Sequence, residues 1–165
     1  MRPIQAWARR KRIEFFVPYL KRNDRVLEIG PGEGWFRKAV EAVGPAEYVT
    51  IDTDAPADIK GDIKQWRPLG LEPSSFDVIV AFEVVEHVDC FQECYDLLKP
   101  SGRLFITTPL PHADWLLKLL EALWLTQKRT SPHSNLVYLR SIPGFAKQEA
   151  RNVFGIGQWG VFHKI

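Results

Sequence analysis

The chain has 165 residues, enough for one domain with a hydrophobic core and short for two. Hydrophobic residues make up 45% and charged residues 25%, as in ordinary globular proteins, and the net charge of +2 favours no polyanionic partner. Two cysteines, four residues apart, exclude a disulfide scaffold and a four-cysteine zinc site, so we expect a reducing, cytoplasmic setting. The longest apolar stretch, residues 115–125, is too short to span a membrane, and we expect no signal peptide.

The first segment, residues 1–22, predicts a basic helix. Four apolar residues with helical spacing give this helix one apolar face: Ile13, Phe16, Val17 and Leu20. Residues 9–12 read Arg-Arg-Lys-Arg. This run is either a patch for nucleic acid or anionic lipid, or the solvated face of the helix. The balanced charge of the whole chain favours the solvated face.

A glycine-rich loop follows a short apolar strand at residues 26–29, and a helix is predicted after it at residues 35–43. The loop contains three alternating glycines and one proline: Gly30, Pro31, Gly32 and Gly34. Strand, glycine loop and helix open a nucleotide-binding βαβ unit, because glycine allows a sharp turn and close approach of a ligand. The alternative is a glycine-rich turn that binds nothing.

The spacing of this loop favours one kind of ligand. The third glycine stands one residue earlier than in the dinucleotide fingerprint, and Glu28 lies two residues before the first glycine. A carboxylate there repels a pyrophosphate and suits an ammonium or sulfonium group. S-adenosylmethionine carries both groups, so this spacing argues against a nicotinamide-dependent oxidoreductase.

Acidic residues end the next two predicted strands. Asp52 ends a strand at residues 47–52. It follows Gly34 at close to the spacing at which an acid binds a ribose diol in such folds, and Asp54 is the competing candidate. Asp62 and Ile63 follow a shorter strand and suit an adenine ring, since the carboxylate accepts from its amino group and the apolar side chain packs on the ring. Either acid is otherwise a solvated residue at a strand end.

The remaining predicted elements alternate between strands and helices. A buried strand at residues 75–82 precedes a helix at 91–98, a turn at 99–102 and a strand at 103–108. Alternation of this kind predicts a parallel sheet with right-handed crossovers.

The last third of the chain predicts an almost wholly apolar helix at residues 112–125, a polar loop at 127–135, a second helix at 144–153 and a glycine-interrupted strand at 156–163. The apolar helix either packs on the sheet or covers an apolar substrate or a partner subunit.

Six motifs in the same order and spacing resemble the class I S-adenosylmethionine-dependent methyltransferases, especially the group related to ubiquinone- and menaquinone-pathway enzymes. They lie at residues 26–34, 52, 61–63, 76–79, 83–88 and 98–104. The resemblance implies an α/β three-layer sandwich around a doubly wound, mostly parallel sheet, in one domain over residues 1–165. Residues 23–109 would form the cofactor-binding core, and residues 110–165 the apolar helix and substrate-side elements. Because the family ends in a strand hairpin and only one strand is evident after the apolar helix, we expect a shortened hairpin, unless residues 136–142 supply the missing strand.

The resemblance also implies roles for the site residues. Glu28 and the glycine loop would hold the methionine part of the cofactor S-adenosylmethionine, Asp52 its ribose, and Asp62 with Ile63 its adenine. Phe82 and Glu83 would line the place where methyl group and acceptor meet, although the family often has a small polar residue in place of Phe82.

Methyl transfer from a sulfonium is an in-line displacement, so alignment and exclusion of water are the main catalytic effects expected. Glu83 and His87 are the leading candidates for a general base where the acceptor must lose a proton; His112 and His133 are others.

A metal site is an alternative use of the same stretch. Glu83, Glu86 and His87 would share one face if the chain were helical there, with His133 as a distant fourth ligand. Some relatives resemble this Glu-x-x-Glu-His pattern and use a metal to hold acceptor oxygens. The opposing interpretation, which we favour, is a fold signature without metal, since magnesium sites are rarely built from so few protein ligands.

The sequence thus predicts a methyltransferase acting on a small molecule, and the apolar helix favours an apolar one. The alternatives are a cofactor-binding or partner-binding module without catalysis, suggested by the short C-terminus, and a metal-assisted RNA or quinone O-methyltransferase. A homodimer through an exposed edge strand would suit a partner-binding module without catalysis.

Overall fold

The computed structural model describes residues 3–54, 56–110, 138–139, 141–153 and 155–165. Its helical elements are α1 (Pro3–Phe16), η1 (Val17–Tyr19), α2 (Arg37–Glu41), η2 (Ile63–Gln65) and α3 (Phe91–Leu97). Its strands are β1 (Arg25–Ile29), β2 (Glu47–Asp52), β3 (Ile59–Lys60), β4 (Phe76–Phe82), β5 (Leu98–Pro109), β6 (Phe145–Val153) and β7 (Gly157–Lys164). Among these residues no helix is both long and apolar enough to pass through a membrane.

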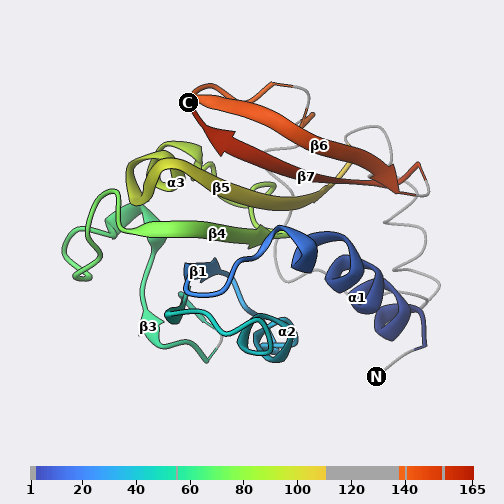
Figure 1. Cartoon of the computed structure of the whole chain (residues 1–165), viewed down its shortest axis with the longest axis horizontal. Coiled ribbons are helices and arrows are strands. Elements are labelled where there is room, and N and C mark those ends of the chain that lie inside the picture. Colours follow the sequence, from blue (N-terminus) through green and yellow to red (C-terminus); the bar gives the residue numbers. More distant parts are fainter. Residues whose placement is uncertain (1–2, 55, 111–137, 140, 154) are drawn as a thin grey trace.

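The strands form one sheet in the order β3-β2-β1-β4-β5-β7-β6 (Figure 1). β1 pairs in parallel with both β2 and β4, and β4 pairs in parallel with β5. Among the strands that the structure describes, the pairs that involve β7 are the antiparallel ones. The strand order reverses between β1 and β4, and ligands of open α/β sheets bind beyond the carboxyl ends of the strands at such a point.

Two apolar layers cover the two faces of the sheet. On one face, α1 and the segment around α2 bring Phe16 and Phe36 against Val78 and Val80 of β4. On the other face, α3 and the segment around η2 pack against a second cluster that includes Ile79. Alternate residues of β4 therefore enter opposite cores, as the two-residue period of a strand requires. The continuous apolar sequence of this strand follows from burial on both sides.

The predicted α/β three-layer architecture with a doubly wound, mostly parallel sheet is confirmed. The basic helix, the strands of the core and the helix at residues 91–98 are present close to their predicted positions. The helix after the glycine loop is shorter than predicted, since residues 33–36 form turns before α2. The apolar helix at residues 112–125 and the polar loop at 127–135 lie outside the described residues.

The prediction of a helix at residues 144–153 was wrong, and the hairpin is not shortened. This stretch is β6, which pairs in antiparallel register with β7 and forms the edge of the sheet. Its sequence contains strong helix formers, but Gly144 and Gly155 bound it at positive φ and β7 offers a full ladder of backbone partners. Only its first residue is buried, so the sequence shows no clear strand alternation. The missing strand is therefore β6. Of residues 136–142, those that the structure describes belong to no strand, although Ile142 makes an isolated bridge.

The predicted turn at residues 99–102 also needs correction, because these residues belong to β5. The strand is irregular there: Ser101 has a φ of 59°, and its pairing with β4 shifts register between Phe76 and Val78. Pro100 and Gly102 gave a genuine signal of local irregularity, which a bulged strand accommodates as well as a turn does.

Candidate functional site

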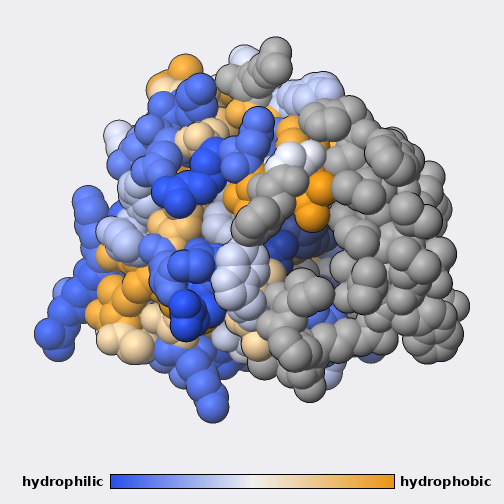
Figure 2. Space-filling view, turned by 90° about the vertical axis from the view of Figure 1, so that its right-hand side faces the viewer, coloured by the Kyte–Doolittle hydropathy of each residue, from blue (hydrophilic) through white to orange (hydrophobic). Residues whose placement is uncertain are grey.

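A cavity of ≈ 300 Å³ opens between the loops that follow β1, β2, β3 and β4, and we call it the switch-point cavity. Seven predicted site residues line it: Gly30, Gly32, Asp52, Asp62, Ile63, Glu83 and His87. Apolar residues that the sequence reasoning missed complete its walls: Ile29, Ile51, Val84 and Val88. Ile29, Val84 and Val88 lie within the motifs at residues 26–34 and 83–88, and Ile51 directly precedes Asp52, which was their only signal. Figure 2 faces the end of the molecule toward which β4 points, where hydrophobic side chains border a hollow among hydrophilic ones.

The glycine loop approaches the loop after β4 too closely for side chains. Gly30 has a φ of 67°, and a Cβ atom there would lie 2.8 Å from Cγ2 of Val84. Gly32 has a φ of 53°, and a Cβ atom there would meet nothing within 4 Å. The first glycine is thus needed for packing between two loops, whereas the second presents bare backbone beside the cavity. This is the arrangement expected where a ligand lies against the main chain.

The acids at the ends of the neighbouring strands take part in local turns and still line the cavity. Asp52 accepts a hydrogen bond from the backbone N–H of Asp54 at 2.8 Å. Asp62 caps η2 by accepting from the backbone N–H of Lys64 at 2.9 Å. Ile63 is buried and supplies an apolar wall next to Asp62. One wall of the cavity therefore combines hydrogen-bond acceptors with an apolar surface, as a nucleoside requires. Asp54, the competing candidate, does not line the cavity.

Glu83 is held at the cavity by three separate contacts. Its backbone N–H donates to the carbonyl of Thr107 at 2.8 Å, and its φ of 57° is rare for a residue with a side chain. Its Oε1 accepts from the Thr107 hydroxyl at 2.8 Å and from Arg12 at 2.7 Å. Arg12 lies on α1, far away in sequence, and its role could not be derived from the basic run alone.

Glu86 lies behind Glu83 and is almost wholly buried, accepting a hydrogen bond from the Thr108 hydroxyl at 3.0 Å. Burial, reinforced by the negative charge of Glu83, raises the pKa of Glu86 to about 8. Glu86 therefore keeps its proton at neutral pH. Successive threonines of β5 thus each hold one of the two glutamates.

Glu28 lies on the face of β1 opposite to Ile29 and does not line the cavity. It is 2% exposed and accepts a hydrogen bond from the Tyr48 hydroxyl. Burial raises the pKa of Glu28 to about 7, against the opposing effects of Tyr48 and Arg37. A direct contact of Glu28 with a ligand in this cavity stays a prediction, and its partner in the structure is Tyr48.

Phe82 likewise faces away from the cavity. Its ring packs among Phe16, Trp35 and Phe36, with centroid distances of 4.7, 5.7 and 5.0 Å. It shares this face with Val78 and Val80, because side chains alternate along β4. This packing accounts for a large aromatic residue where the related sequences often have a small polar one. Pro31 and Gly34 belong to the glycine loop without lining the cavity.

The three residues of the metal hypothesis do not form a ligand cluster. Residues 85–87 form a turn, in which the backbone N–H of His87 donates to Val84 at 2.8 Å. Within the part of the chain that the structure describes, no group of three acidic, histidine or cysteine side chains could hold a metal ion. His133 lies outside the described residues, as does His112.

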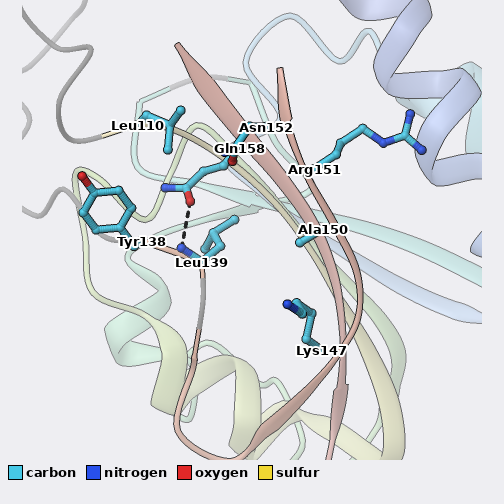
Figure 3. Close-up of a pocket in the computed structure, with 8 residues that line it drawn as sticks. All are labelled: Leu110, Tyr138, Leu139, Lys147, Ala150, Arg151, Asn152 and Gln158. Atoms are coloured by element: carbon cyan, nitrogen blue, oxygen red, sulfur yellow. Dashed lines mark hydrogen bonds between the residues drawn. The ribbon is translucent and has the colours of Figure 1, made fainter. Parts of the chain in front are cut away.

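A second pocket, the hairpin pocket, has a volume of ≈ 330 Å³ and lies against β6 and β7. Figure 3 shows Lys147 pointing toward it and Arg151 pointing away toward α1. The side chain of Gln158 reaches across to accept from the backbone N–H of Leu139 at 2.9 Å (Figure 3). Among the described residues that line this pocket there is neither a glycine loop nor a carboxylate, so the nucleotide-like features belong to the switch-point cavity.

The sheet order, the antiparallel last strands and a cavity at the strand reversal define a Rossmann-like fold of the class I methyltransferase type. The chain matches the methyltransferase domain family over residues 4–148, and it belongs to that family.

Individual relatives cover parts of this chain. The mitochondrial ubiquinone biosynthesis O-methyltransferase of Rattus norvegicus is 60% identical over 105 residues, which cover 51% of this chain and 30% of the relative. The chain spans less than half the length of the curated relatives it matches.

Solved structures extend the likeness over nearly the whole chain. A Pyrococcus horikoshii protein is 21% identical, with a TM-score of 0.65 and coverage of 94% of this chain and 91% of its own. A SAM-dependent methyltransferase of Aquifex aeolicus is 14% identical, with a TM-score of 0.61 and coverage of 93% and 89%. At these identities the likeness supports the fold.

Proposed function

We propose that this protein binds S-adenosylmethionine in the switch-point cavity and transfers its methyl group to a small-molecule acceptor. The observation that carries the proposal is the lining of this cavity, in a chain that belongs to the methyltransferase domain family. Bare glycine backbone, an acid for a ribose diol and an acid beside an apolar wall stand on successive loops. When bound, the cofactor would supply an activated methyl group, while the protein's own residues would align the acceptor and exclude water.

Two residues of the cavity suit the handling of an acceptor proton. Glu83 and His87 both line the cavity on the loop after β4. Either would accept a proton from a hydroxyl acceptor in this proposal, with Glu83 fixed by Thr107 and Arg12. The name of the Rattus relative supports a hydroxyl on an apolar, quinone-related molecule as the acceptor class.

The ion pairs of α1 support a small acceptor over RNA. Each basic residue of the run at 9–12 pairs with a glutamate of this chain. A run whose charges are satisfied internally offers less attraction to phosphates than a free basic patch. The complete hairpin of β6 and β7 also removes the observation that suggested a non-catalytic module. The cytoplasmic location and the homodimer stay predictions.

Isothermal titration with S-adenosylhomocysteine, the product of the donor, tests cofactor binding. Asp52→Ala is expected to weaken binding at least about tenfold, because a lost bidentate acceptor leaves the ribose hydroxyls unpaired. Asp54→Ala is the matched control, since that exposed carboxylate lies two residues away and outside the cavity lining. No binding by the unmodified protein, or equal losses in both variants, would contradict the proposal.

Transfer itself is tested with a radiolabelled donor methyl group and a panel of catechols, simple phenols and short RNAs. Incorporation into a phenolic acceptor is the expected result. Incorporation into RNA alone would replace the proposed acceptor class, and cofactor binding without any transfer would favour the module without catalysis.

A further inference from the structure

Two arginines of α1 reach the two loops on either side of the strand reversal. Arg9 pairs with Glu33 of the glycine loop, and Arg12 pairs with Glu83 of the loop after β4, each at 2.7 Å. Their spacing of three residues places both on one face of the helix. The residues between them pair with Glu14 of α1 itself. The basic run therefore divides into one face that serves the site and one that serves the helix.

The two pairs differ in how strongly they are expected to act. Glu33 is 66% exposed, and an ion pair at such a surface contributes little. Arg12 is only 21% exposed and lies over the ring of Trp159 at 5.9 Å, so its position is fixed by packing as well as by charge. Glu83 is 40% exposed, more than Arg12, and lines the switch-point cavity.

Of the two glutamates beside the cavity, Glu83 is the one that meets a cation, Arg12. Burial raises the pKa of Glu86 to about 8, so that residue is neutral at pH 7. Arg12 and Thr107 both bind the same oxygen of Glu83, Oε1. The guanidinium thus fixes the direction of this carboxylate and offsets its charge at the cavity wall.

We propose that Arg12 is a positioning residue that acts through Glu83 and sets the preference of the cavity between a sulfonium ligand and its neutral thioether product. The inference rests on the proposed function. S-adenosylmethionine carries a positive charge at sulfur that S-adenosylhomocysteine lacks, so a carboxylate in the cavity attracts the two ligands unequally. With Arg12 in place, much of that attraction is cancelled. S-adenosylmethionine then gains little electrostatic binding energy over S-adenosylhomocysteine. The positive charge of the donor is therefore not enough by itself to displace the product.

The test compares the dissociation constants of S-adenosylmethionine and S-adenosylhomocysteine by isothermal titration. Arg12→Gln is expected to raise the ratio Kd(S-adenosylhomocysteine)/Kd(S-adenosylmethionine) by about threefold or more, because Glu83 loses its cation. Arg12→Lys keeps the charge and is expected to restore the ratio to within about twofold of the unmodified protein. Arg10→Gln, whose partner Glu14 lies on the same helix, is the matched control and leaves the ratio unchanged.

The double variant Arg12→Gln/Glu83→Gln separates the carboxylate from any general effect of the helix. Without the carboxylate the ratio is expected to return toward that of the unmodified protein. An unchanged ratio in Arg12→Gln, or a raised ratio that persists in the double variant, would overturn the inference. If Arg12→Gln does not fold, Glu83→Gln alone tests the same point, since the unbalanced guanidinium should lower the ratio and a constant ratio would refute the inference.

These outcomes remain distinct from those of the proposed function. If the unmodified protein binds neither ligand, the proposed function fails and this inference fails with it. If the unmodified protein binds both and the ratio does not respond to Arg12, only the inference fails.

Discussion

At the scale of single residues, Gly30 is a position where two loops of the site leave no room for a side chain. Gly30→Ala is expected to lower the free energy of unfolding by about 1–3 kcal/mol, since strain at positive φ adds to the clash with Val84. Chemical denaturation measures this loss. Gly70→Ala is the control for strain alone, because Gly70 also has positive φ while a Cβ atom there would meet nothing within 4 Å. Equal losses in the two variants would show that the loop contact is unimportant.

The buried glutamate behind the site makes stability depend on pH. The pKa of Glu86 is about 8 in the folded protein against 4.5 as its ordinary value, so the folded state binds a proton that the unfolded state releases. Stability from this group is therefore lost as the pH rises from about 4.5 to about 8. Glu86→Gln removes this dependence. The free energy of unfolding of the variant, minus that of the unmodified protein, should therefore increase between pH 5 and pH 8. The increase should be a few kcal/mol at most, since a change of one pKa unit corresponds to about 1.4 kcal/mol.

Urea unfolding at the two pH values checks this expectation. Glu72→Gln replaces an exposed glutamate and should give parallel curves. A stability difference between Glu86→Gln and the unmodified protein that is the same at both pH values would contradict it.

The positions of site residues were predictable where a motif requires a particular residue type, and not where contact with a distant element determines them. Gly30, Gly32, Asp52, Asp62 and Ile63 line the cavity as their motifs indicated. Glu28 and Phe82 turned out to face the opposite side of the sheet, which alternation along β1 and β4 determines. The link between Arg12 and Glu83 joins positions 71 residues apart, and no local pattern records it.

At the scale of elements, α1 is joined to the sheet by aromatic packing. Phe16 is wholly buried, and its ring lies 4.7 Å from Phe82 and 5.3 Å from Phe105. Phe16→Ala is expected to cost about 3–5 kcal/mol of stability, as measured by denaturant unfolding, because a large cavity remains in a rigid core. Trp7→Ala on the same helix should cost far less, since Trp7 is 41% exposed. Similar losses would mean that α1 is not packed as described.

The strands differ in how clearly their sequences predict a strand. β4 has a continuous apolar sequence because both of its faces are covered, and it was identified directly. β6 is an edge strand with mostly exposed, charged side chains such as Lys147 and Arg151. Charges on an edge strand discourage pairing with other chains and also erase the alternation that identifies a strand. The same residues reduce the support for a dimer through this edge.

At the scale of the whole molecule, ligand binding should stabilise the fold through the loops that it joins. At a concentration of 100 times its dissociation constant, S-adenosylhomocysteine is expected to add about 2.7 kcal/mol. For a chain of 165 residues this corresponds to a rise in Tm of about 5–10 °C, measured by thermal shift. NADH is the comparison ligand, and stabilisation by NADH instead would return attention to a dinucleotide site.

The pairing of β5 has a consequence for how the protein forms during synthesis. Its inner stretch is buried, and it lies between β4, which precedes it, and β7, which follows far later in the chain. A nascent chain that ends at Pro109 has every loop of the switch-point cavity but leaves one apolar edge of β5 without its partner. Thr107, which holds Glu83, sits on that edge opposite Trp159. The β6–β7 hairpin must therefore be synthesised before Thr107 and the edge of β5 around it are covered. Until then the unpaired edge of β5 can pair with the wrong strand.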